Sequence, residues 1–194
     1  NGNSRIVSQS CYGVVSDIAP CDTNNPANVE CSQIDIGCFH GNAVADLAAG
    51  NRFSATLQGG QKIAIGGVAP EAKISFARIT LNAKGELDES LLIGALEKFL
   101  NDIKSNSSTA PDVINISIGF SRDGKFANCN APSEIKTIID SIVANNVTVV
   151  ASSGNSAYKD KIMFPACLDN VISVGATETK SSTGESVASF SQSS

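Results

Sequence analysis

Two hydrophobic patterns alternate along the chain from residue 40 onward. Short apolar runs rich in β-branched residues favour strands, and they cover residues 73–79, 112–119, 147–152 and 170–175. Residues 88–104 and 133–145 instead repeat their apolar side chains every three or four positions, which is typical of amphipathic helices. Strands that alternate with helices predict an α/β fold with a mostly parallel sheet.

The ends of these elements give further expectations. Asp88 and Ser133 stand just before the two helical segments and are predicted N-caps. Right-handed crossovers place the carboxyl ends of parallel strands at one edge of the sheet. Ligand-binding and catalytic groups are expected at that edge.

The first 39 residues differ from the rest, because they are rich in Asn, Ser, Pro and Cys and show little periodicity. They predict an irregular, Cys-rich loop region, followed by an α/β core over residues 40–194. A length of 194 residues fits one domain with a sizeable core. We therefore expect a single domain over residues 1–194.

Charge and hydropathy exclude two classes of partner. The formal net charge is −5 and no basic run occurs, so a nucleic-acid partner is not expected. No apolar stretch reaches the roughly 18 residues of a membrane-spanning helix, so no membrane association is expected. We expect a monomer.

Six cysteines lie at positions Cys11, Cys21, Cys31, Cys38, Cys129 and Cys167. Their spacing lacks the paired pattern of a zinc site, so no metal site is predicted from them. An even number in a loop-rich chain favours disulfides and an oxidising compartment, which means a secreted or periplasmic protein. We expect local pairing: Cys11–Cys21, Cys31–Cys38 and Cys129–Cys167. The alternative is six reduced, buried thiols in a cytosolic protein.

Two side chains are candidates for acid–base and electrostatic catalysis. His40 is the only histidine and opens a helix-like run of small residues, where a neutral imidazole can act as a general base. Asn155 follows a strand directly after Ser152, Ser153 and Gly154, and its amide can donate to a developing oxyanion. The alternatives are a capping histidine without a catalytic role and an ordinary polar turn.

A third candidate is the strand end formed by Ser117, Ile118 and Gly119. An exposed strand end can pair with an extended peptide by main-chain hydrogen bonds. The alternative is an ordinary strand terminus.

Several short motifs, taken in order, resemble the subtilisin-like serine proteases (subtilases, the peptidase S8 family). H-G-N-A-V-A-D at residues 40–46 is similar to the family's H-G-T-H-V-A-G. The other similar segments are G-V-A-P-E-A at 67–72, D-V-I-N-I-S-I-G at 112–119, A-S-S-G-N at 151–155, F-P-A-C at 164–167, V-I-S-V-G-A at 171–176 and A-S-F-S at 188–191. The Cys-rich opening also resembles a secreted bacterial subset of the family.

The resemblance implies a three-layer α/β/α fold and a secreted serine endopeptidase that hydrolyses peptide or protein substrates by a Ser-His-Asp mechanism without a required cofactor. His40 would be the general base and Asn155 the oxyanion donor, both facing one cleft. Two opposite pocket walls and a flanking loop would bind the substrate. One wall would consist of Ser117, Ile118 and Gly119, and the other of Ser152, Ser153 and Gly154. The flanking loop would contain Gly85. A structural calcium ion is compatible with the oxygen-rich residues 22–25, which match no motif and also fit an Asn-rich turn.

The sequence also departs from the family pattern. The strand that carries the catalytic Asp and the motif that carries the nucleophilic Ser are both absent, and Asn42, Ala43 and Asp46 alter the histidine motif. We therefore expect an inactive fragment of a longer protease, or one chain of a nicked one. The alternatives are a catalytically inactive subtilase-like domain that binds extended peptides or a protein partner, and an unrelated α/β binding domain.

Overall fold

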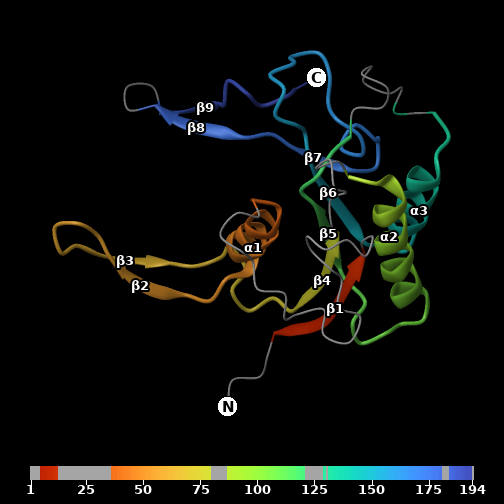
Figure 1. The fold of residues 1–194 in the computed structure, drawn as a ribbon, viewed down its shortest axis with the longest axis horizontal. Coiled ribbons are helices and arrows are strands. Elements are labelled where there is room, and N and C mark those ends of the chain that lie inside the picture. Colours follow the sequence, from red (N-terminus) through yellow and green to blue (C-terminus); the bar gives the residue numbers. More distant parts are fainter. Residues whose placement is uncertain are drawn as a thin grey trace. The chain divides into compact units, whose positions relative to one another are not determined.

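The computed structural model describes residues 5–12, 36–79, 87–120, 129, 131–180 and 184–193. Within these ranges the elements follow one another along the chain as Figure 1 labels them. They are β1 (Ile6–Tyr12), α1 (Ile36–Ala49), β2 (Phe53–Thr56), β3 (Lys62–Ile65), β4 (Ile74–Ile79), α2 (Glu89–Lys104), β5 (Val113–Ile116), α3 (Glu134–Ala144), β6 (Thr148–Ser152), β7 (Ile172–Val174), β8 (Thr177–Lys180) and β9 (Gly184–Val187).

The chain divides into two compact units, Asn1–Ala95 and Leu96–Ser194, and the division falls within α2. In the first unit β1 and β4 pair in parallel, and β2 and β3 form an antiparallel hairpin. Helix α1 lies against β4, because a β-carbon added to Gly41 would be 3.5 Å from Cζ of Phe76. The absence of a side chain at Gly41 thus permits the close approach of helix and strand.

The second unit is built on a parallel sheet in the order β5-β6-β7. Helix α3 connects β5 to β6 and packs against β6. Its buried face consists of four isoleucines, Ile135, Ile138, Ile139 and Ile142. These residues, with Val149 and Ala151 of β6, form the core that holds the sheet in place.

The expected strands and helices of the α/β core are confirmed. Strands β4 to β7 and helices α2 and α3 lie within or close to the predicted ranges. Ser133 is the N-cap of α3, where its hydroxyl accepts from the Lys136 backbone N–H at 3.1 Å. Asp88 accepts from the Ser90 hydroxyl at 2.7 Å and from the Ser90 backbone N–H at 2.9 Å, and these two hydrogen bonds lower the pKa of the Asp88 carboxyl. The fold class is α/β with mostly parallel strands, as the sequence predicts.

The expectation of an irregular region over residues 1–39 is wrong for two segments. Residues 6–12 form β1, in which Ser8, Gln9 and Ser10 break the apolar pattern that marks a strand in the sequence. Pairing with β4 supplies the backbone hydrogen bonds that this polar strand needs. Helix α1 begins at Ile36, so His40 lies one turn inside the helix rather than at its start.

The described helices can be compared with the length and hydropathy of membrane-spanning helices. Among them, no helix combines the length and the apolar character needed to cross a lipid bilayer.

Candidate active site

The candidate groups of the second unit meet at the carboxyl edge of its sheet. Strands β5 and β6 run parallel, with Ile116 opposite Ala151, so residues 117–119 and residues 152–155 leave the sheet at the same edge. This is the edge where α/β folds place ligand and catalytic groups. The structure therefore brings together both segments that the sequence proposes as pocket walls.

The first segment, residues 117–119, is partly buried and held at both ends. The side-chain amide of Asn115 donates to the Ser117 hydroxyl at 2.8 Å. The Phe120 backbone N–H donates to the Phe164 carbonyl at 2.9 Å, and these two residues form an isolated antiparallel bridge. The segment thus keeps an extended course beyond the end of β5.

The second segment is a turn over residues 153–156. Ser153 is 3% exposed, and its backbone N–H donates to the Val174 carbonyl at 2.9 Å. Gly154 has φ +111°, a left-handed conformation that favours glycine. Asn155 is exposed at the tip of this turn.

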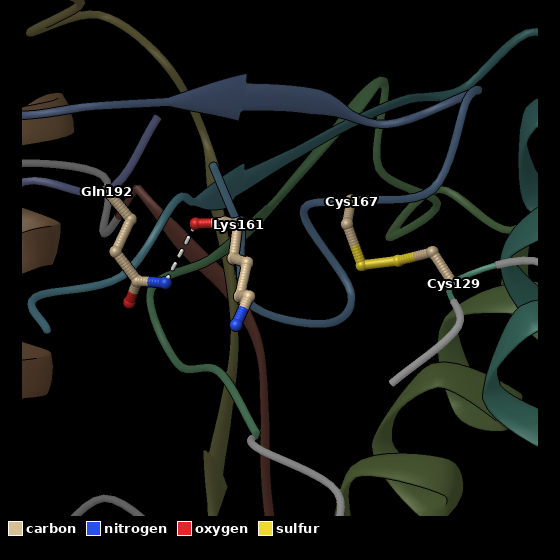
Figure 2. Close-up of a disulfide and its surroundings, with 4 residues drawn as sticks. All are labelled: Cys129, Lys161, Cys167 and Gln192. Atoms are coloured by element: carbon tan, nitrogen blue, oxygen red, sulfur yellow. Dashed lines mark hydrogen bonds between the residues drawn. A yellow bond between two sulfur atoms is a disulfide. The ribbon is translucent and has the colours of Figure 1, made fainter. Parts of the chain in front are cut away.

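Gln192, which the sequence analysis missed, ties this turn to the segment 191–193. Its backbone N–H donates to the Gly154 carbonyl at 3.0 Å, and its carbonyl accepts from the Ser153 hydroxyl at 2.9 Å. Its side-chain oxygen accepts from the Ser156 backbone N–H at 3.3 Å, and its side-chain nitrogen donates to the Lys161 carbonyl at 3.0 Å. Figure 2 shows the last of these bonds.

The turn therefore holds an exposed amide between two anchored neighbours. Residues on both sides of Asn155 are fixed by Gln192, whose side chain is nearly inaccessible at 2% exposure. A donor that is held before the substrate arrives stabilises developing negative charge without a reorganisation cost. The position of Gln192 directly after the A-S-F-S motif was the only sequence signal for this role.

His40 belongs to the first unit, where it is exposed on α1. The last turn of this helix is capped by the backbone of residues 67–69, whose N–H groups donate to the carbonyls of Gly50, Leu47 and Ala48 at 2.8 to 3.1 Å. The G-V-A-P motif thus completes the helix that carries the histidine. The convergence of His40 and Asn155 on one cleft stays a prediction.

Asp46 is one of the three residues that alter the histidine motif. The structure places Asp46 on the exposed side of α1, where a carboxylate needs no buried partner. Asn42 and Ala43 are also exposed. The three departures from the family motif therefore lie on the surface of the first unit.

The remaining predicted residues have mixed outcomes. Cys129 and Cys167 form a disulfide, which is the expected pairing, with Cα atoms 5.8 Å apart (Figure 2). Cys11 also takes part in a disulfide. Gly85, residues 22–25, Cys21 and Cys31 lie outside the described residues, as does the side chain of Cys38. Within the described part of the chain, no group of His, Cys, Asp and Glu side chains is placed to hold a metal ion.

Known proteins resemble this chain in sequence and in structure. Subtilisin-like protease 3 of Pseudogymnoascus destructans is 30% identical over 143 residues, which cover 74% of this chain and 30% of that protein. The minor extracellular protease Epr of Bacillus subtilis is 29% identical over 127 residues, covering 66% of this chain and 17% of that protein. Among solved structures, a psychrophilic protease aligns with a TM-score of 0.56 and 27% identity, over 77% of this chain and 43% of that chain.

The chain thus spans less than a third of the length of these two curated relatives. The sequence model of the subtilase family matches residues 16–194, which is nearly the whole chain. This chain belongs to the subtilase family.

Proposed function

We propose that this chain is part of a secreted serine endopeptidase that hydrolyses peptide bonds in extended peptide or protein substrates. One observation carries the proposal: the exposed Asn155 sits in a turn anchored on both sides, at the same sheet edge as residues 117–119. A fixed donor beside an extended backbone segment suits acyl transfer, in which an oxyanion develops at a carbonyl held by main-chain pairing.

In this proposal each candidate residue has one task. His40 takes the proton from the nucleophilic serine and later gives it to the leaving amine. Asn155 donates its side-chain N–H to the oxyanion, and residues 117–119 pair with the substrate backbone. The serine and the aspartate belong to parts of the parent protein outside these 194 residues, so the chain alone is expected to be inactive.

Secretion is the second part of the proposal. The disulfide between Cys129 and Cys167 supports an oxidising compartment, because such bonds are rare where thiols are kept reduced. A relative described as extracellular, the protease Epr, supports the same compartment. Detection of the protein in culture medium rather than in the cell lysate tests this point.

The catalytic proposal is tested on the full-length parent with a fluorophosphonate probe and a peptide substrate. We expect covalent labelling, loss of labelling in His40→Ala, and a fall in kcat of about 10²- to 10³-fold in Asn155→Ala with little change in KM. Asn101→Ala is the matched control, because Asn101 is an exposed residue of α2. A folded parent that binds peptide but is neither labelled nor active would support the non-enzymatic binding domain instead.

A further inference from the structure

The turn formed by residues 163–168 links the two segments that the proposed function treats as pocket walls. At the start of this turn, the Met163 backbone N–H donates to the Ser153 carbonyl of the second wall at 2.9 Å. One residue later, the Phe164 carbonyl accepts from the Phe120 N–H, directly beyond the first wall, at 2.9 Å. Both walls are thus tied to the same short turn.

The disulfide between Cys129 and Cys167 connects this turn to the chain that follows the first wall (Figure 2). Cys167 belongs to the turn itself, because its N–H donates to the Met163 carbonyl at 3.1 Å. Phe120 and Cys129 are therefore both attached to the turn, the first by a hydrogen bond and the second by a covalent bond.

These two attachments differ greatly in strength. A backbone hydrogen bond changes an equilibrium by a net factor of about 5. A covalent bond that closes a loop of about ten residues, as between Phe120 and Cys129, is worth about 100-fold by the chain-entropy relation. Once the disulfide is broken, the weaker attachment at Phe120 is the remaining hydrogen bond between the first wall and the turn within the described part of the chain.

The disulfide is open to chemical change. Cys129 and Cys167 are both partly exposed, so a small thiol can reach the bond between them. Reduction transfers two electrons and two protons from two thiol groups to the disulfide; the S–S bond breaks, both cysteines become thiols and the reductant becomes a disulfide. An oxidised small disulfide compound reverses the reaction. Neither state alters His40 or Asn155 chemically.

We propose that the disulfide between Cys129 and Cys167 is a redox switch for substrate binding. In the oxidised form the first wall is held to the turn and pairs with the backbone of an extended peptide. In the reduced form, which prevails where thiols are kept reduced, the wall is released and the affinity for peptides falls. The inference rests on the proposed function, which assigns the walls to substrate binding, and it adds a means of keeping the site weak before export.

The size of the effect follows from the contacts that persist after reduction. Apparent substrate affinity falls in proportion to the fraction of molecules whose wall is in place. The loop-closure factor of about 100 is the upper limit, because the parallel pairing of β5 with β6 still holds the start of the wall. We expect KM for an extended peptide to rise by about 10-fold on reduction. The value of kcat is expected to change by less than about 2-fold, since the lost contacts bind the ground state and the transition state alike.

The test measures peptide hydrolysis by the full-length parent at rising ratios of reduced to oxidised dithiothreitol. Alkylation followed by mass spectrometry records the state of Cys129 and Cys167 at each ratio. We expect KM to rise as these two cysteines are reduced and to recover on reoxidation. An unchanged KM in the fully reduced wild type overturns the inference, whether or not any variant folds. A disulfide that stays oxidised at every ratio overturns it as well.

The double variant Cys129→Ser with Cys167→Ser is the matched control, because dithiothreitol also reduces the disulfide of Cys11. This variant is expected to show the raised KM without reductant and to lose the response to it. A variant that responds as the wild type does places the switch at another disulfide and overturns the inference.

The fluorophosphonate probe separates this inference from the proposed function. Labelling is expected to persist in the reduced parent, and its loss on reduction overturns a switch that acts on binding alone. A parent that is labelled and active, but whose KM does not respond to reduction, keeps the protease function and loses the switch. A folded, oxidised parent that is neither labelled nor active overturns both.

Discussion

Truncation of Gln192 gives the sharpest test of the anchored turn. Gln192→Ala keeps the two backbone bonds, to Gly154 and from Ser153, but removes the two side-chain bonds, from Ser156 and to Lys161. Each lost hydrogen bond costs about 1 kcal/mol net. The removed atoms leave a space in a site that is only 2% exposed, which adds about 1 kcal/mol. We expect a loss of about 3 kcal/mol in the free energy of unfolding.

The same variant is expected to affect catalysis less than removal of the oxyanion donor. Asn155 keeps its side chain, but Ser156 on one side is released from Gln192. Since loss of a whole donor lowers kcat by about 10²- to 10³-fold, release of one anchor is expected to lower kcat by about 10-fold with KM nearly unchanged. A selective effect on kcat distinguishes a positioning residue from one that serves folding alone.

Urea unfolding of the inhibited parent protein and steady-state kinetics of the active form measure the two effects. At a urea m-value of about 3 kcal/mol per M, a loss of 3 kcal/mol lowers the unfolding midpoint by about 1 M urea. Ser189→Ala, at an exposed neighbouring position, is the control and should change neither quantity. In Gln192→Glu the introduced carboxylate cannot donate to the Lys161 carbonyl, so stability should improve as the pH falls and that carboxyl is protonated. A Gln192→Ala variant with unchanged midpoint and unchanged kcat would refute the reasoning.

Three further predictions concern stability. Gly154→Ala should lower the free energy of unfolding by more than about 2 kcal/mol in urea unfolding, because φ is +111° and the added carbon would meet Met163; an unchanged midpoint would contradict the described turn. The double variant Cys129→Ser with Cys167→Ser should lose about 4 kcal/mol by the chain-entropy relation for a separation of 38 residues, as measured under non-reducing conditions. Asp102→Asn should lose about 0.5 kcal/mol at pH 7, since the hydrogen bond from Lys98 lowers the pKa of this partly exposed carboxyl. Because a lowered folded-state pKa stabilises only while the carboxyl is ionised, this difference should be present above about pH 4 and vanish in more acidic solution.

The elements with strong periodicity could be predicted from the sequence. Helices α2 and α3 have continuous apolar stripes, and strands β5 and β6 are rich in β-branched residues with buried side chains, so local preference and burial agree there. Strands β4 and β7 follow their local strand preference without fully buried side chains. Strand β1 and the two hairpins could not be predicted in this way. The hairpins are short and largely exposed, and β1 has a polar centre whose strand conformation depends on pairing with β4.

Only those parts of the candidate site that lie in recognisable sequence motifs could be predicted. Residues 117–119 and 152–155 follow strands, and the position of a strand end is readable from the sequence. Gln192 contacts residues 31 to 39 positions away in the chain, and no pattern in its neighbourhood reveals those contacts. The extension of α1 to Ile36 was also hidden, because Gly37 and Cys38 are weak helix formers.

All the hydrogen bonds described for the turn around Asn155 have their partners in the second unit. Its partners are Val174, Met163 and Gln192, all of them within Leu96–Ser194. The substitutions in the histidine motif lie on an exposed face of α1, within the first unit. None of the hydrogen bonds described for the turn involves the histidine motif, so the substitutions in that motif remove none of these bonds. A hydrogen-bonded turn around Asn155 is therefore expected whether or not the parent protein is catalytically active.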